Sequence, residues 1–143
     1  MITTNRVTNE RLLGMVEADG WEHLEPTRGK GQDGLLVITG QLCNWALMSQ
    51  YTAPRLDRKR HVIARQGNNK LLEDRIVRPL RERLGVCVFY KKNALMRIMK
   101  AINKGDVCGL LIDQKLNPPE GIYVDLFGKP APTTASSALL QVR

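Results

Sequence analysis

Residues 34–40 read Gly-Leu-Leu-Val-Ile-Thr-Gly, a short apolar run bounded by a glycine at each end. A continuous apolar run of this length predicts a strand that is buried on both faces, because buried helices are usually longer. Residues 107–112, Val-Cys-Gly-Leu-Leu-Ile, show the same pattern. We therefore expect both segments to be inner strands of a parallel or mostly parallel sheet.

The sequence between and around these two runs alternates between strand and helix patterns. We expect strands at residues 61–64 and 85–90. Pro79 lies inside one of the expected helices, which it should kink or split. The alternation predicts an α/β fold in which a mostly parallel sheet carries helices on both faces. The expected helices cover residues 9–23 (ending near Gly20), the residues after 44, 71–84, 93–104 and the residues after 134.

Length and composition fit a single globular domain, residues 1–143, with a leading helix and Gly/Lys loop over 1–33 and an α/β core over 34–143. No segment approaches the roughly 20 apolar residues of a membrane span. The 22 basic and 14 acidic residues give a formal net charge of +8, which favours an anionic partner such as nucleic acid, an anionic membrane surface or a phosphorylated substrate. The aromatic content of 5% leaves few side chains for base stacking, so we expect no nucleic acid.

Two patterns that suggest cofactor or metal sites do not have the required context. Residues 29–34 match G-x-G-x-x-G, but a dinucleotide site needs a strand before this loop and a helix after it, whereas here a strand follows. His23 and His61 have no Cys, Asp or Glu at ligand spacing, and we expect them to be solvated or at helix ends. The sequence therefore predicts neither a cofactor nor a metal.

The three cysteines, Cys43, Cys87 and Cys108, form no C-x-x-C pair. Cys87 and Cys108 fall within apolar runs, where a cysteine is usually a small buried side chain. We expect thiols in a reducing compartment rather than disulfides.

The most informative stretch is Thr39-Gly40-Gln41-Leu42-Cys43-Asn44-Trp45-Ala46. It follows a predicted buried strand and should turn tightly into a helix, at the edge of the sheet where α/β proteins bind ligands. It resembles the T-G-H-x-G-N-W-E/D block of the bacterial lipid A biosynthesis (lauroyl/myristoyl) acyltransferases. This family is part of the lysophospholipid acyltransferase-like superfamily, which has a His, four residues, and then Asp or Glu.

Further blocks of that family follow in order along nearly the whole chain. They resemble its R-x-x-x-N, R-x-x-x-G, L-K-x-G, D-Q and G-x-x-V-x-F-F-G-x-P-A segments. The matching positions are Arg65 with Asn68 and Asn69, residues 81–85, residues 101–105, Asp113 with Gln114, and residues 121–131.

The resemblance implies transfer of a fatty acyl group from an acyl carrier protein thioester, or acyl-CoA, to a hydroxyl of a lipid A precursor or related glycolipid. It also implies a location at the cytoplasmic face of the bacterial inner membrane. The family's His is the general base and its acidic residue orients the imidazole. Here Gln41 and Ala46 occupy these positions, and neither an amide nor a methyl group can accept the proton. We expect this chain to be catalytically impaired.

The remaining site residues are also implied by the resemblance. Arg81, suited to bidentate contact with phosphate, and Asp113, at the end of a strand, join Gln41 and Ala46 at the catalytic positions. We expect Gln41, Arg81 and Asp113 to converge on one cleft at the carboxyl edge of the sheet. The candidate substrate-binding residues are Arg65, Asn44 and Gln114.

Two other interpretations stay open. The chain could be a non-catalytic basic module that binds anionic lipid or, as a weaker alternative, nucleic acid. Cys43, at the start of a helix, is a rival nucleophile for a covalent route. Because family members extend further on both sides, we also expect a partial domain, from either a decayed gene or a fragment.

Overall fold

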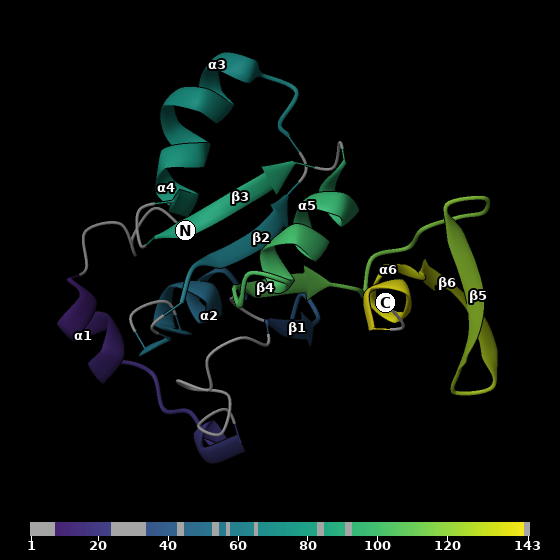
Figure 1. Ribbon diagram of the computed structural model, residues 1–143, viewed down its shortest axis with the longest axis horizontal. Coiled ribbons are helices and arrows are strands. Elements are labelled where there is room, and N and C mark those ends of the chain that lie inside the picture. The colour runs from purple at the N-terminus through teal and green to yellow at the C-terminus, as the bar shows by residue number, and fades with distance from the viewer. Residues whose placement is uncertain are drawn as a thin grey trace.

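The computed structural model contains a four-stranded parallel sheet in the order β1-β4-β2-β3 (Figure 1). The strands are β1 (Leu35–Thr39), β2 (Arg60–Ala64), β3 (Val86–Tyr90) and β4 (Val107–Leu111). The predicted α/β class with a mostly parallel sheet is confirmed. The structure describes residues 8–23, 34–42, 45–52, 55–56, 58–64, 66–82, 85–90 and 93–141.

Of the two strands expected inside the sheet, only β4 is an inner strand. It pairs with β1 on one side and β2 on the other. Among the described residues β1 pairs with β4 alone, so the prediction of an inner position for β1 is wrong. An apolar run reports that a strand is shielded from water, whereas strand order depends on pairing between distant segments, which the run does not encode.

Helices cover both faces of the sheet, as the alternation of side chains along β3 shows. Phe89 packs against the core cluster of Ile98, Ala101, Cys108 and Leu110, which includes residues of α5 (Ala94–Ile102). The next residue, Tyr90, contacts Glu73 in the helical segment that precedes β3. Successive side chains of a strand point to opposite faces, so α5 and this segment lie on opposite faces of the sheet.

The helical segment before β3 widens just before its proline. It runs through α3 (Lys70–Leu72), a π-helical stretch (Glu73–Val77) and α4 (Arg78–Glu82). Asn69 caps its start, because its side chain accepts a hydrogen bond from the N–H of Leu72 at 3.1 Å. Pro79 has no N–H to donate, and the helix changes its hydrogen-bonding pattern there instead of splitting into separate pieces.

The N-terminal helix is shorter than expected, whereas the helices after β1 and after residue 134 form as expected. The N-terminal helix α1 covers only Asn9–Gly14, so it ends at Gly14 and not near Gly20; a short 3-10 turn, Trp21–His23, follows it. Helix α2 (Trp45–Thr52) follows β1, and α6 (Ser136–Gln141) forms after residue 134, both as expected.

Sequence analysis assigned no secondary structure to the stretch that forms an antiparallel hairpin of β5 (Gly121–Leu126) and β6 (Lys129–Thr134). Its two-residue turn, Phe127-Gly128, has positive φ values of 54° and 76°, which are typical of the tight turns that join twisted strands.

Candidate functional site

The turn after β1 and the loop after β4 meet at the carboxyl edge of the sheet. These strands are parallel neighbours, so their ends lie side by side. The backbone N–H of Gln41 donates a hydrogen bond of 2.5 Å to Oδ2 of Asp113. A Cβ atom on Gly40 would lie only 3.3 Å from the same oxygen. The glycine therefore allows the close approach by which the Asp113 carboxylate fixes this turn.

Gln41 and Asp113 are both exposed. Position 41 is thus accessible to a substrate, while its backbone is held by a carboxylate from the loop after the neighbouring strand. Because the contact uses the backbone N–H, it does not depend on the side chain at position 41. The geometry gives Asp113 a positioning role in the turn.

Replacing Asp113 by Ala should lower the free energy of unfolding by about 1 kcal/mol, because a hydrogen bond to a charged acceptor is lost at an exposed position. Asp113→Asn keeps an acceptor oxygen and should lose less. Urea unfolding followed by circular dichroism measures both, with Gln114→Ala as the neighbouring exposed control. An Asp113→Ala chain as stable as the control would show that the contact does not hold the turn.

A second group of polar side chains surrounds Glu73, whose side chain is only 2% exposed. Nη1 of Arg81 lies 2.6 Å from its Oε1, and the hydroxyl of Tyr90 donates to the same oxygen at 3.1 Å. The N–H of Gly67 donates to Oε2 at 3.0 Å. Both carboxylate oxygens are therefore engaged. Burial is the main cause that raises the pKa of Tyr90, and the hydrogen bond to Glu73 raises it further.

Sequence analysis found Arg81 but missed the buried carboxylate that holds it. Nothing in the local pattern separates Glu73 from its exposed neighbour Asp74, and its partners lie up to 17 residues away. The Arg81 side chain is 27% exposed. Its fork has five N–H donors, so it can hold Glu73 and still offer donors to an anion.

The two groups lie along the same edge of the sheet but are not joined. Gln41 and Asp113 lie at the ends of β1 and β4, whereas Arg81 and Glu73 meet Tyr90, the last residue of β3. Strand β2 separates β4 from β3. Within the described segments no contact links Arg81 to Gln41 or Asp113. The single cleft expected for these three residues stays a prediction.

The other predicted site residues are placed less completely. Gln114 is exposed next to Asp113. Ala46 lies in α2, but its side chain is outside the described part of the structure. Asn44 and Arg65 also lie outside the described residues, as do Cys43 and the Gly/Lys loop at 24–33.

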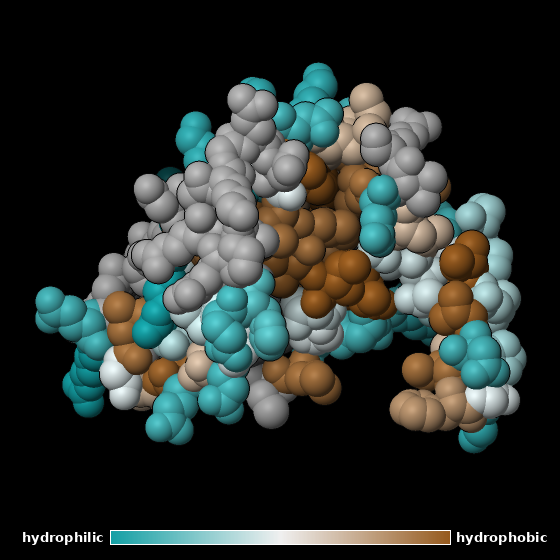
Figure 2. All heavy atoms as spheres, turned by 60° about the horizontal axis from the view of Figure 1, so that its bottom comes forward, coloured by the Kyte–Doolittle hydropathy of each residue, from teal (hydrophilic) through white to brown (hydrophobic). Residues whose placement is uncertain are grey.

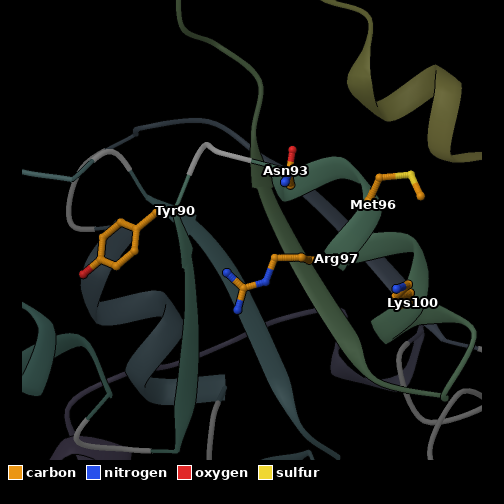
Figure 3. Close-up of a pocket in the computed structure, with 5 residues that line it drawn as sticks. All are labelled: Tyr90, Asn93, Met96, Arg97 and Lys100. Atoms are coloured by element: carbon orange, nitrogen blue, oxygen red, sulfur yellow. The ribbon is translucent and has the colours of Figure 1, made fainter.

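A basic depression that begins beside the end of β3 and extends along α5 was not predicted. It is lined by residues of α5 and the end of β3: Tyr90, Asn93, Met96, Arg97 and Lys100 (Figure 3). The Arg97 side chain extends from α5 toward Tyr90 (Figure 3), and its Cζ lies 4.4 Å from the centre of the Phe89 ring. Arg97 and Lys100 are three residues apart, which puts two cations on one helix face. This spacing is the signal from which sequence analysis could have found the depression.

His61 differs from its prediction as a solvated or helix-end histidine. It is 8% exposed. Its Nε2 lies 2.8 Å from Oδ2 of Asp106, and its ring stacks on Phe89 with 4.6 Å between centroids. The partner carboxylate is 45 residues away in the sequence, so local spacing could not reveal it. The prediction of a solvated position is right for His23, which is exposed.

The two described cysteines differ in exposure. Cys108 is fully buried, and burial raises its pKa to about 12. Cys87 lies on β3 at the edge of the sheet and is exposed, so the prediction that it is buried is wrong. An edge strand is covered less completely than its apolar sequence suggests.

In the folded protein, iodoacetamide at neutral pH should label Cys87 and leave Cys108 unmodified, because thiolate and access are both needed for reaction. Mass spectrometry of the peptides measures labelling at each site, and a urea-unfolded sample is the control in which both react. Equal labelling of Cys87 and Cys108 in the folded chain would contradict the buried position of Cys108.

Within the described residues, no group of three or more His, Cys, Asp or Glu side chains could hold a metal ion. None of the described helices is long and apolar enough to cross a bilayer.

Comparison with known proteins places the chain in a family. A family model described as bacterial lipid A biosynthesis acyltransferase matches residues 1–143. No curated protein matched the chain. The family match covers the turn at Gln41, the Asp113 loop that fixes it, and Arg81 with its buried partner. The chain therefore belongs to the bacterial lipid A biosynthesis acyltransferase family.

Proposed function

We propose that this chain carries the acyl-transfer scaffold of its family but turns over slowly, because Gln41 and Ala46 occupy the positions of the base and its acidic partner. The reaction is transfer of a fatty acyl group from an acyl carrier protein thioester, or acyl-CoA, to a hydroxyl of a lipid A precursor. The observation that carries the proposal is the turn at the carboxyl edge, where the Asp113 carboxylate holds the backbone of Gln41.

The weak step is removal of the acceptor's proton. As the hydroxyl oxygen attacks the thioester carbon, the carbon–sulfur bond breaks, and the acceptor's proton must pass to a base and finally to the departing thiolate, which becomes the free thiol. A primary amide cannot take up that proton near neutral pH. The scaffold can position the reactants, but the general-base contribution is missing.

Anion binding is the part of the machinery that remains in the described residues. Arg81 can offer free N–H donors while one nitrogen holds Glu73, and Arg97 and Lys100 line a depression on the α5 side of the sheet. Phosphate groups occur on both the carrier protein's prosthetic arm and lipid A precursors. These cations therefore suit either partner, and a membrane-lipid acceptor suits the cytoplasmic face of the bacterial inner membrane.

The test compares binding with turnover. The chain should bind a phosphorylated lipid A precursor in a titration calorimeter, and it should transfer a negligible amount of radiolabelled acyl group from a carrier protein thioester. Arg81→Lys should weaken precursor binding because Lys has no planar fork, and Arg11→Lys on α1 is the control. Rapid transfer that Cys43→Ser abolishes would overturn the proposal and establish a covalent route. Absence of precursor binding would also overturn it.

A further inference from the structure

The β5–β6 hairpin displays an unusual concentration of apolar surface. Five of the six residues 122–127 are large exposed hydrophobics: Ile122, Tyr123, Val124, Leu126 and Phe127. The hairpin projects from the body of the protein (Figure 1), and several apolar residues lie among polar ones on this projecting part at the right of Figure 2. An exposed apolar cluster of this kind marks an interaction surface.

The turn of the hairpin places its largest apolar side chain at the apex. Phe127 is 97% exposed and has a φ of 54°. Asn and Gly adopt this left-handed conformation more readily than Phe. Oδ1 of Asp125 accepts the N–H of Gly128 at 3.1 Å and holds the turn closed. Folding alone would favour a different residue at 127, which points to a role for the phenyl ring outside the fold.

The outer edge of β6 is unsuited to strand pairing. Pro130 and Pro132 are two residues apart in β6, so they face the same edge of the strand. A proline has no N–H to donate to a neighbouring strand. This edge therefore disfavours sheet extension. The apolar side chains have to be covered by something other than a strand added at β6.

We propose that the tip of the hairpin, residues 126–129, inserts into the interfacial region of an anionic bilayer. Leu126 and Phe127 are the exposed apolar side chains that would enter the acyl-chain boundary of the bilayer. Lys129 directly follows the turn, where a lysine can reach lipid headgroups. The net charge of +8 draws the chain to an anionic leaflet.

A hydrogen bond also connects the hairpin to the carboxyl edge of the sheet. The hydroxyl of Thr133 in β6 donates to the carbonyl oxygen of Ile112 at 3.0 Å, and Asp113 is the next residue. Insertion would bring the turn at Gln41 to the membrane surface. This inference rests on the proposed function in one respect, which is that the acceptor is a membrane lipid.

Flotation with vesicles of phosphatidylethanolamine and phosphatidylglycerol tests the insertion. Phe127→Asn should lower the partition coefficient measured by flotation about tenfold or more, because burial of a phenyl ring is lost. Asn suits the left-handed turn, so the variant should fold at least as well as the parent chain. Leu71→Gln is the matched control, because Leu71 is also exposed, at 62%, but lies in α3; it should bind as the parent does.

A second measurement reports insertion directly. Phe127→Trp should be quenched by brominated lipids in these vesicles, whereas Leu71→Trp should not, after subtraction of the signal from the parent chain. Equal quenching at both positions, or unchanged binding of Phe127→Asn, would overturn the proposal. A change from dimer to monomer in Phe127→Asn without lipid, measured by analytical ultracentrifugation, would also overturn it, because the surface would then join two copies of the chain.

These assays contain no acyl donor. Failure of the proposed function, seen as absent precursor binding or as rapid acyl transfer, therefore leaves the vesicle result unaffected, and vesicle binding that does not depend on the hairpin overturns only the membrane inference.

Discussion

The double substitution Gln41→His with Ala46→Glu should raise acyl transfer by about 10²- to 10⁴-fold, which is the usual contribution of a positioned general base. The turn should tolerate the new imidazole because Asp113 holds residue 41 through its backbone N–H and not through its side chain. Transfer of radiolabelled acyl groups from a carrier protein thioester to a lipid A precursor measures the gain. An active member of the family serves as the positive control for the assay.

The single substitutions separate the two roles. Gln41→His alone supplies a base without its orienting carboxylate and should give a smaller gain, while Ala46→Glu alone should give none. Gln41→Asn changes the side chain without adding a base and is the matched control. If the double variant transfers no faster than Gln41→Asn, loss of the dyad is not what limits this chain.

The strands were predictable because each is a short apolar run, and short runs report burial directly. The order of the strands in the sheet was not predictable, because strand pairing joins residues that are far apart in the sequence. Thus Leu35–Thr39 lies at an edge and Cys87 is exposed on another. The hairpin was less predictable, because Asp125 interrupts the apolar run of its first strand and Pro130 and Pro132 argue against a strand in its second.

The residues of the candidate site likewise include some that the sequence predicted and some that it did not. Gln41 and Asp113 were both found by resemblance, and the structure adds the contact between them. Glu73 and the pair of His61 with Asp106 were missed, because a buried charged or polar side chain is recognised by its partner and the partners come from other elements. Local sequence contains the residue types but not the pairing.

Removal of Arg81 should have the largest effect on stability. Arg81→Met should lower the free energy of unfolding by about 3 to 5 kcal/mol, because it leaves the Glu73 carboxylate buried without its cation. Among the described residues, the Tyr90 hydroxyl and the Gly67 N–H would remain as partners. Glu73→Gln should cost less, since the amide is neutral and the partly exposed Arg81 can be hydrated. Guanidinium unfolding followed by circular dichroism measures each variant.

The same helix supplies the control. Arg78 forms an exposed pair with Glu82 at 3.1 Å, and an exposed pair contributes little, so Arg78→Met should change stability only slightly. If Arg81→Met costs no more than Arg78→Met, the buried pair does not stabilise the fold. If the large loss is found, the nitrogen of Arg81 that holds Glu73 must stay there in the folded chain. In the function proposed above, the N–H groups that remain free on this guanidinium, whose position the fold has already fixed, are the ones that would bind an anionic substrate.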